Sequence, residues 1–359
     1  MGIIHQKIAI LCNYELLPQR VGGMDYFFWL FNEKCKEKNI EVHWFFPNIA
    51  THGNYKNFNL YASNHDNVEN YFLEHHSQNQ YSHIITHFVE LCTPFFKNVK
   101  KNSNATIIAI DHNPRPLLGY SFKKKIEKKI KGFLYSKYIN LFVGVSNYTV
   151  DEIIKDFGNH VKKKTITVYN GVIIDDIKVR EIRDYDNPSF LVASHLRMSK
   201  GIQDLIDAVA LLSPVLKNKI TIAVYGDGPY KEILLEKVRL LGLEKNFTFE
   251  GSKSNLKEIF CNYDYMLQPT HMECFSLSIL ESLAANVPVI TTNVGGNEEA
   301  IVNNTNGYIY KAKDYIALKN ILEKILMHDL KITKNTRQLV EEKFSLSKMV
   351  DNHINLLQI

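Results

Sequence analysis

The chain has 359 residues, 45% of them hydrophobic and 23% charged, which is the composition of an ordinary globular protein. One hydrophobic core rarely supports this length, so two domains are expected, and no apolar run approaches the roughly 18 residues of a membrane-spanning helix. The five cysteines are scattered without C-x-x-C spacing, which argues against a disulfide framework or a zinc site and favours a reducing, cytoplasmic setting.

The net charge of +5 is unevenly distributed along the chain. Basic residues outnumber acidic residues by 21 to 14 in residues 1–172, whereas residues 173–359 contain 22 basic and 24 acidic residues. A basic first half favours an acidic or membrane-borne partner.

Residues 1–172 alternate short β-rich runs with helical patterns, which predicts a parallel sheet with crossover helices. The N-terminal apolar stretch is too short for a signal peptide and instead predicts the first strand. The expected strands are 8–11, 41–45, 83–86, 106–110, 141–145 and 165–169, and expected helices include 24–38 and 122–138.

Two loops of this half follow strands, and open parallel sheets bind ligands beyond the carboxyl ends of their strands. Gly22 and Gly23 lie in the loop after the first strand, just before a helix. Adjacent glycines allow the backbone to approach a phosphate or sugar closely, although they also suit a tight turn into a helix. His112 follows the strand at 106–110 and could hydrogen-bond a sugar hydroxyl or move a proton; the alternative is a structural histidine.

Residues 123–131 form the densest basic run, Lys-Lys-Lys-Ile-Glu-Lys-Lys-Ile-Lys. At helical spacing, Ile126, Ile130, Phe133 and Leu134 form an apolar stripe flanked by lysines, which suits docking at an anionic membrane surface. The alternative is an ordinary helix that lays this stripe on the sheet while the lysines remain at its edges. Nucleic acid is not expected as a partner, because no nucleic-acid-binding module accompanies the run.

The turn dipeptide Asn170-Gly171 and the charged stretch that follows it indicate a break between two halves. The second half repeats the alternation of strands and helices. Its expected strands are 189–193, 220–225, 247–250, 265–268, 289–292 and 307–309, and its expected helices are 202–212, 230–241, 256–261, 277–285 and 317–328, with a last helix at about 346–357.

Three loops of the second half carry candidate binding residues. Arg197 and Lys200 lie three residues apart, next to a glycine that opens a helix, which suits a diphosphate; the alternative is a solvated loop. Gly226, in the sequence Tyr-Gly-Asp-Gly-Pro, is expected mainly to permit a turn near the ligand. Gly251, after the strand at 247–250, would let a nucleobase approach the backbone.

The segment at 269–281 concentrates the candidate chemistry. It contains two carboxylates eight residues apart, Glu273 in a loop and Glu281 on an apolar helix. A carboxylate on so apolar a helix is costly without a partner, and a sugar diol is a suitable partner because each carboxylate accepts several hydrogen bonds. The helix start at Phe275, Ser276 and Leu277 would present backbone N–H groups and a positive dipole end to a phosphate. The segment could therefore bind a sugar, a ribose and a diphosphate.

Taken together, these motifs resemble the retaining GT-B glycosyltransferases of the GT4 type over most of the chain. Glu273 to Glu281 matches the E-x7-E signature of that family, and Gly226-Asp227-Gly228-Pro229 resembles its G-x-G-x turn. Further similarities are Val145-Ser146-Asn147, Tyr169-Asn170-Gly171-Val172, and the stretch from Val287-Pro288-Val289-Ile290 through Gly295-Gly296 to Glu299.

The resemblance implies an α/β fold of the GT-B type, with two Rossmann-like domains facing each other across a cleft. Residues 1–172 would form the acceptor-binding domain, and residues 173–343 would form the donor-binding domain. A C-terminal helix at 344–359 would pack back on the first domain, and domain closure would assemble the site.

The resemblance also implies roles for individual residues. Glu281 would bind the ribose hydroxyls and Glu273 the hydroxyls of the donor sugar, while Lys200 and an arginine would neutralise the leaving diphosphate in place of a metal ion. His112 would contact the transferred sugar. The catalytic candidates are therefore His112 and Glu273, and the donor-binding candidates are Gly22, Gly23, Arg197, Lys200, Gly226, Gly251, Phe275, Ser276, Leu277 and Glu281.

The chain departs from the family pattern at two places, one expected near the diphosphate of the donor and one expected near its sugar. His195 stands five residues before Lys200, where the family usually has arginine, so whether Arg197 or His195 serves the diphosphate stays open. Cys274 and Ser276 stand where the family often has glycine, which narrows the space beside the sugar and leaves the identity of the sugar open.

The expected protein is a retaining hexosyl- or N-acetylhexosaminyltransferase that needs no metal or other cofactor. Its expected partners are a nucleotide-sugar donor, with a UDP-sugar favoured, and a glycan or lipid-linked acceptor in bacterial surface polysaccharide, lipopolysaccharide or another glycoconjugate. The expected location is the cytoplasm, and peripheral attachment to the inner face of the membrane is one open alternative. Two other functions stay open: different sugar-nucleotide chemistry such as epimerisation, and a non-catalytic nucleotide-sugar-binding subunit. The linkage and the oligomeric state also stay open.

Overall fold

The computed structural model describes residues 6–17, 21–64 and 67–358 and divides the chain into two compact units. Unit 1 runs to Asn170 and also contains the segment that begins at Leu346, whereas unit 2 is Gly171–Ser345. The boundary thus lies two residues before the one expected at 172/173. The last position of the helix expected at 344–359 lies outside the described residues.

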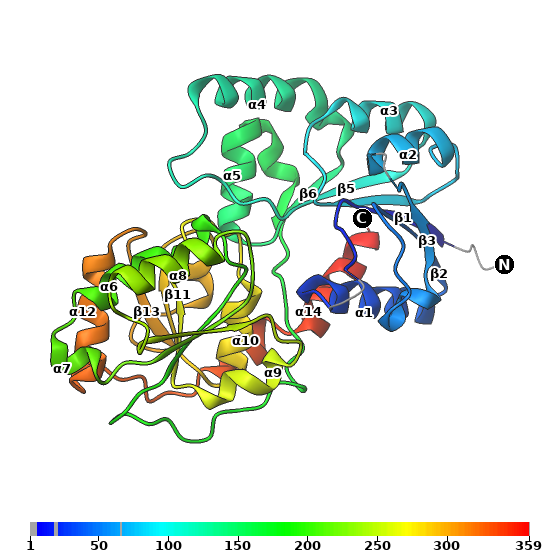
Figure 1. The fold of residues 1–359 in the computed structure, drawn as a ribbon. Coiled ribbons are helices and arrows are strands. Elements are labelled where there is room, and N and C mark those ends of the chain that lie inside the picture. Colours follow the sequence, from blue (N-terminus) through cyan, green and yellow to red (C-terminus); the bar gives the residue numbers. More distant parts are fainter. Residues whose placement is uncertain (1–5, 18–20, 65–66, 359) are drawn as a thin grey trace. The chain divides into compact units, whose positions relative to one another are not determined.

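Unit 1 is built around a seven-stranded sheet in the order β3-β2-β1-β4-β5-β6-β7, in which every strand pairs parallel to its neighbour (Figure 1). The strands are β1 (Gln6–Cys12), β2 (Ile40–Phe46), β3 (Asn59–Ala62), β4 (His83–His87), β5 (Thr106–Asp111), β6 (Leu141–Gly144) and β7 (Thr165–Thr167). The central strands are apolar on both faces and are covered by helices on both, as parallel sheets require.

The helices of unit 1 form two layers on this sheet (Figure 1). They are α1 (Gly23–Glu37), α2 (Val68–His75), α3 (Pro94–Asn102), α4 (Phe122–Tyr135), α5 (Asn147–Phe157) and α14 (Leu346–Asn355), with 3-10 turns at Gly53–Asn57, Ser136–Tyr138, Asn159–Lys164 and Leu356–Gln358. Phe28 of α1 packs on Trp44 and Phe46 of β2, and Phe72 of α2 packs against Phe45, whose side chain points to the opposite face.

Helix α14 belongs to unit 1 although it is the last helix of the chain. Its His353 is buried and lies 4.6 Å, between ring centroids, from Phe27 of α1. The ring of His353 is also stacked near that of His87, at the end of β4. His353 also contacts Phe31 of α1, so α14 helps to cover the apolar side chains of Phe27 and Phe31.

Unit 2 has a six-stranded parallel sheet in the order β10-β9-β8-β11-β12-β13. Its strands are β8 (Phe190–Ala193), β9 (Ile222–Tyr225), β10 (Phe247–Gly251), β11 (Tyr265–Gln268), β12 (Val289–Thr292) and β13 (Gly307–Tyr310). Its helices are α6 (Ile202–Ala210), α7 (Pro214–Lys217), α8 (Lys231–Leu240), α9 (Leu256–Ile259), α10 (Leu277–Ala284), α11 (Asn297–Ala300), α12 (Tyr315–Leu326) and α13 (Arg337–Lys343), with 3-10 turns at Met198–Lys200 and Phe260–Asn262.

The predicted α/β fold and every predicted strand are confirmed, with strand ends that differ by at most two residues. The short edge strand β3 was not predicted, because Asn59-Leu60-Tyr61-Ala62 is neither alternating nor strongly apolar. Within the described part of the chain, no helix has both the length and the apolar character needed to cross a membrane.

Candidate functional site

The candidate residues of unit 2 gather where the order of its strands reverses. Strands β8 and β11 are neighbours in the sheet, and the strands that follow each of them along the chain lie on opposite sides of this pair. In sheets of this kind, ligands usually bind beyond the carboxyl ends of two such strands. The loop after β8 carries Arg197 and Lys200, and the loop after β11 carries Glu273.

An ion pair joins these two loops. Lys200 Nζ lies 2.8 Å from Glu273 Oε2, and both side chains are partly exposed. Glu273 also accepts a hydrogen bond from its neighbour's amide, Cys274 N–H, at 3.3 Å, and a long one from Gln268 Nε2 at 3.4 Å. Because a carboxylate offers about four acceptor positions, Glu273 retains the capacity to bind a ligand hydroxyl.

Gly201 allows the two loops to approach so closely. Its φ is +69°, and a Cβ at this position would lie 1.8 Å from the carbonyl oxygen of Pro269. The approach is stabilised by a backbone hydrogen bond of 2.8 Å from His271 N to Ser199 O. His271 is also hydrogen-bonded to Asp204 of α6, which further fixes the loop after β11.

The start of α10, which follows Glu273 in the chain, is fixed by contacts with β11 and with the loop after β12. Ser276 is the N-cap of α10, and its hydroxyl lies 2.8 Å from Gln268 Nε2 at the end of β11. Phe275 is buried against Phe344, and Leu277 is the first helical residue. Gly295, in the loop after β12, packs closely against the backbone of Glu273. Its φ is +63°, and a Cβ at this position would lie 2.0 Å from Glu273 O.

Glu281 differs sharply from Glu273 in its surroundings. It is partly buried on α10 among Leu280, Leu283 and Ala284, and the described residues provide its carboxylate with no hydrogen bond or ion pair. Burial raises the pKa of the Glu281 carboxyl to about 7, an effect that the positive charge of Lys257 opposes. An unpaired carboxylate in this position is suited to accept hydroxyl hydrogen bonds from a ligand.

The other predicted residues of unit 2 divide into two kinds. Arg197 is exposed and has no ion pair among the described residues, which leaves its guanidinium available to an anion. Gly226 has a structural task, because its φ is +130° and a Cβ would lie 1.9 Å from Ser194 O. Gly251, in contrast, has open space where a Cβ would stand, and its carbonyl accepts a hydrogen bond from Gly226 N–H.

In unit 1 the candidate glycines lie after β1 and at the start of α1. Gly22 is the N-cap of α1, and its N–H donates to the buried carboxylate of Asp25 at 2.7 Å. Asp25 also accepts a hydrogen bond of 2.7 Å from Tyr55. The Gly22 amide is thus already used within the protein, whereas Gly23 is exposed at the first turn of α1.

His112 lies in an aromatic cluster at the ends of β4 and β5. Its Nε2 is 3.0 Å from Nδ1 of His87, and its ring stacks on Phe88 at a centroid distance of 4.2 Å. Burial lowers the pKa of His112 to about 3, so the imidazole is neutral near pH 7. A neutral imidazole can hydrogen-bond a hydroxyl, but it cannot act as the protonated imidazolium that a histidine of ordinary pKa can provide.

Several residues at these sites were not predicted from the sequence. Gln268, Asp25, His87 and Phe88 each contact a predicted residue through hydrogen bonds or stacking. The sequence contains a signal for two of them, since Gln268 and His87 are polar residues at the ends of otherwise apolar strands. Among residues 6–17, 21–64 and 67–358, no group of three or more His, Cys, Asp or Glu side chains could hold a metal ion.

Comparison with known proteins finds a family match in unit 2. Residues 173–343 match the family described as Glycosyl transferases group 1. N-acetyl-alpha-D-glucosaminyl L-malate synthase of Bacillus anthracis is 30% identical over 164 residues, which cover 45% of this chain and 42% of that protein. The capsular polysaccharide biosynthesis glycosyltransferase CapM of Staphylococcus aureus is 27% identical over 256 residues, which cover 64% of this chain and 67% of that protein.

The fold is shared over nearly the whole chain. The crystal structure of Anabaena Alr3699/HepE in complex with UDP matches with a TM-score of 0.79 and 17% identity, covering 98% of this chain and all of that one. The architecture is thus the GT-B fold of two Rossmann-like domains. The family match and the relatives support a GT-B glycosyltransferase. The chain spans less than half the length of the first curated relative that it matches.

Replacing Gly201 with alanine should destabilise unit 2. The substitution combines a left-handed φ with a Cβ that meets the Pro269 carbonyl, so a loss of about 1–3 kcal/mol in the free energy of unfolding is expected. Gly242→Ala is the control, because Gly242 has φ +63° but open space around its Cβ. Chemical denaturation should show the larger loss for Gly201→Ala. Equal losses for the two variants would mean that the close approach of the loops is not tightly constrained.

Glu281→Gln should stabilise the ligand-free protein at alkaline pH. The pKa of Glu281 in the folded protein lies above the ordinary value of 4.5. Its contribution to the free energy of unfolding is therefore fully present below about pH 4.5, where the carboxyl is protonated in both states, and is lost as the pH rises through about 7. The neutral amide avoids this loss, and the free energy of unfolding should exceed that of the wild type by about 1–3 kcal/mol at pH 8. The two proteins should be alike at pH 4.5. A glutamine variant less stable than the wild type at pH 8 would contradict the assignment of an unpaired carboxylate.

Proposed function

We propose that the protein is a retaining glycosyltransferase that moves a sugar from a UDP-sugar to an acceptor hydroxyl without a metal ion. The observation that carries this proposal is the unpaired carboxylate of Glu281 on α10, the helix that follows the loop in which Glu273 pairs with Lys200 at the switch point of unit 2. The match of residues 173–343 to Glycosyl transferases group 1 covers all of these residues and supports it.

Each part of the donor has a proposed partner in unit 2. The ribose hydroxyls would donate to Glu281, and the open side of Gly251 would accommodate the base. The backbone N–H groups at Phe275, Ser276 and Leu277 would bind the diphosphate or the sugar at the start of α10. UDP is the favoured nucleotide because the HepE structure, which shares the fold, contains UDP.

Lys200 and Glu273 would act on the reacting end of the donor. Lys200 already holds Glu273 in place, so its ammonium would lie between that carboxylate and the arriving diphosphate. Glu273 would accept hydroxyl hydrogen bonds of the transferred sugar. Arg197, which is exposed beside Lys200, is the proposed second cation rather than His195.

The proposed reaction is a transfer on one face of the sugar. The bond between the anomeric carbon and the diphosphate oxygen breaks, and the acceptor hydroxyl forms the new bond from the same side while its proton passes to the departing diphosphate oxygen. Lys200 and the N–H groups of α10 would stabilise the charge that develops on the diphosphate. His112, neutral at pH 7, would orient the sugar through a hydrogen bond, and Gly22 and Gly23 would approach the diphosphate.

The acceptor is proposed to be a glycan or a lipid-linked saccharide in bacterial surface polysaccharide, lipopolysaccharide or related glycoconjugate synthesis. Similarity to CapM, a capsular polysaccharide biosynthesis glycosyltransferase, supports this class. A hexose or an N-acetylhexosamine is proposed as the transferred sugar. The five free cysteines support a reducing, cytoplasmic location.

Replacing Glu281 with alanine should weaken UDP binding. The loss of a charged acceptor for the ribose hydroxyls is expected to cost about 1–3 kcal/mol, which isothermal titration calorimetry would measure as a roughly 5- to 150-fold rise in Kd. Glu298→Ala is the matched control, because Glu298 is an exposed carboxylate on the short helix α11. Unchanged affinity in Glu281→Ala would remove the ribose role.

Transferase activity should persist in excess EDTA. Lys200, Arg197 and the first turn of α10 would provide the charge stabilisation that a divalent cation supplies elsewhere. Product formation from a panel of nucleotide-sugars would be measured with and without the chelator. An enzyme that is inactive in EDTA and recovers with Mn²⁺ would refute the metal-independent mechanism. Isomerised donor in the absence of acceptor would indicate an epimerase, and UDP binding without hydrolysis or transfer would indicate a binding subunit.

A further inference from the structure

Helix α4 is oriented with its apolar side toward solvent. Phe122 is 79% exposed, Phe133 78% and Ile130 54%. Ile126 and Leu134 of α4 are exposed as well, and so are Leu117 and Leu118 in the loop before the helix. Surface helices normally turn such a stripe toward the core, and large exposed apolar patches mark interaction sites. The sequence-based alternative of a stripe lying on the sheet is therefore wrong.

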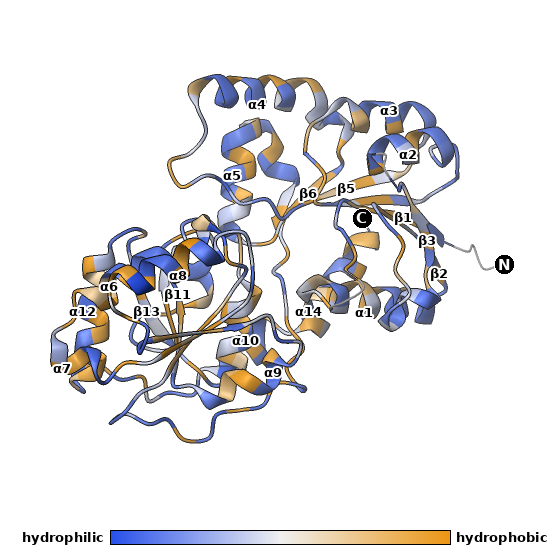
Figure 2. Ribbon diagram, viewed as in Figure 1, coloured by the Kyte–Doolittle hydropathy of each residue, from blue (hydrophilic) through white to orange (hydrophobic). Residues whose placement is uncertain are grey.

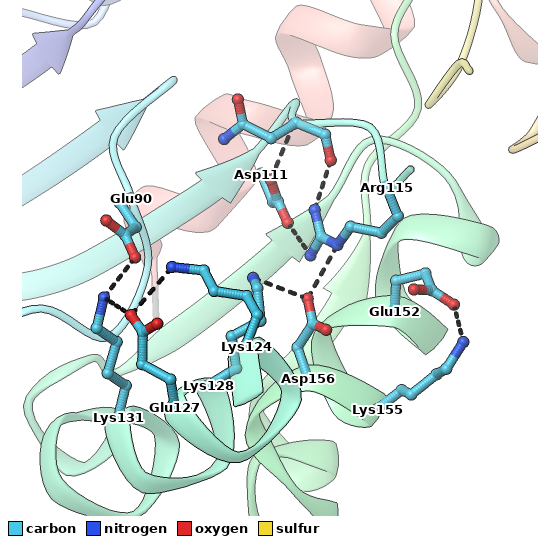
Figure 3. Close-up of polar contacts among 11 residues, drawn as sticks. Glu90, Asp111, Arg115, Lys124, Glu127, Lys128, Lys131, Glu152, Lys155 and Asp156 are labelled. Carbon is cyan, nitrogen blue, oxygen red and sulfur yellow. Dashed lines mark hydrogen bonds and ion pairs between the residues drawn. The ribbon is translucent and has the colours of Figure 1, made fainter. Parts of the chain in front are cut away.

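The opposite, charged side of α4 faces the protein and is held there by ion pairs, as Figure 3 shows. Lys128 Nζ lies 3.1 Å from Asp156 Oδ2 of α5. Lys131 Nζ lies 2.7 Å from Glu90 Oε1 and 2.9 Å from Glu127 Oε1. Glu127 also pairs with Lys124 at 3.0 Å. Lys128 and Lys131 thus attach the helix to the rest of unit 1, and Lys124 is paired within the helix.

Buried groups reinforce this attachment. Asp156 is buried, and it accepts a second contact of 2.9 Å from the guanidinium of Arg115. Arg115 is in turn paired with the buried carboxylate of Asp111, at the end of β5, at 2.7 Å. Removal of any one partner would leave a buried charge uncompensated, so this network fixes α4 to the sheet.

A glycine on the inner side excludes rotation of the helix. A Cβ at Gly132 would lie 2.3 Å from the carbonyl oxygen of Phe157, at the end of α5. The helix axis therefore passes too close to α5 for any side chain at this position. If α4 turned its apolar stripe inward, Ile130 or Phe133, the stripe residues nearest in height to Gly132, would have to occupy this narrow contact.

The outer face combines the apolar stripe with unpaired lysines. Lys123, Lys125 and Lys129 are exposed, and the structure gives them no ion pair among the described residues. On a helical wheel, Lys125 and Lys129 border one side of the stripe, and Lys123 lies within its other edge, between Ile130 and Leu134. Glu127 is the only acidic residue of α4, and it lies on the inner side. Figure 2 shows how hydrophobic and hydrophilic residues alternate along this helix.

We propose that the outer face of α4, defined as Phe122, Lys123, Lys125, Ile126, Lys129, Ile130, Phe133 and Leu134, docks on an anionic lipid bilayer. The apolar side chains would enter the interface between headgroups and acyl chains, and the three lysines would lie at the phosphate level. A second copy of the chain suits this face poorly, because a twofold contact would place lysine opposite lysine with no carboxylate between them. The proposal stands on unit 1 alone and does not depend on the proposed transferase activity.

Vesicle sedimentation with the full chain tests the proposal. Wild-type protein should bind vesicles that contain phosphatidylglycerol but not vesicles of pure phosphatidylcholine. Lys123→Gln, Lys125→Gln and Lys129→Gln combined should lower the partition constant on the order of 100-fold, since each lysine near an anionic surface contributes roughly fivefold. Phe122→Gln with Phe133→Gln should abolish binding at the same lipid composition.

Matched controls separate this face from general charge and hydrophobicity. Lys219→Gln, Lys245→Gln and Lys311→Gln remove the same charge from exposed positions of unit 2. Ile182→Gln with Leu240→Gln removes side chains that are 83% and 69% exposed. Both control proteins should bind vesicles as the wild type does. All variants should retain the wild-type circular dichroism and UDP affinity, which shows that they fold.

Two results would overturn the proposal. One is a wild-type protein that does not bind anionic vesicles, or outer-face variants that bind them as well as the controls do. The other is a concentration-dependent dimer, measured by sedimentation velocity, that Phe122→Gln with Phe133→Gln abolishes while vesicle binding is absent. The second result would assign the face to self-association.

Discussion

The candidate site depends on one contact, the ion pair between Lys200 and Glu273. It joins the loops that leave β8 and β11, the neighbouring strands at which the strand order of unit 2 reverses. Gly201 allows the loop after β8 to approach Pro269 of the loop after β11, and Gly295 allows the loop after β12 to approach Glu273, because each has left-handed backbone where a Cβ would collide with a carbonyl. With the loops joined, the start of α10 lies directly after Glu273, and Glu281 follows one turn later on the same helix.

The two glutamates of this segment therefore differ in kind. Glu273 has a cation and an amide as partners, so its charge is already stabilised in the ligand-free protein. Glu281 has no such partner among the described residues, and burial raises its pKa to about 7. A carboxylate kept in a costly position is characteristic of functional sites, because the missing partner is provided by the ligand. The difference supports separate roles for the two residues rather than an acid–base pair.

The sequence was sufficient to predict the strands and the loops that follow them, because apolar runs bounded by glycine, proline and asparagine are local signals. Glu273 and Glu281 were singled out by their spacing and Lys200 by its place after β8; the structure brings Lys200 and Glu273 into contact, and the roles of all three residues stay predictions. The sequence did not predict partners that are distant in the chain. His112 meets His87, and Lys128 meets Asp156, only after the sheet has formed. The sequence left both orientations of the α4 stripe open for the same reason, since the outward one depends on Glu90, Asp156 and the narrow contact at Gly132.

The most direct test of the account compares the affinities of UDP and 2′,3′-dideoxy-UDP by calorimetry at pH 8 and pH 6. Both ligands carry the same diphosphate, so the ratio of their Kd values isolates the ribose hydroxyls. If Glu281 is the ribose acceptor, UDP should bind roughly 5- to 150-fold more tightly at pH 8, and the ratio should fall at pH 6, where the carboxyl is mostly protonated. Glu281→Gln should show a smaller ratio that does not change with pH. Equal affinities of the wild type for the two ligands at pH 8 would contradict the account.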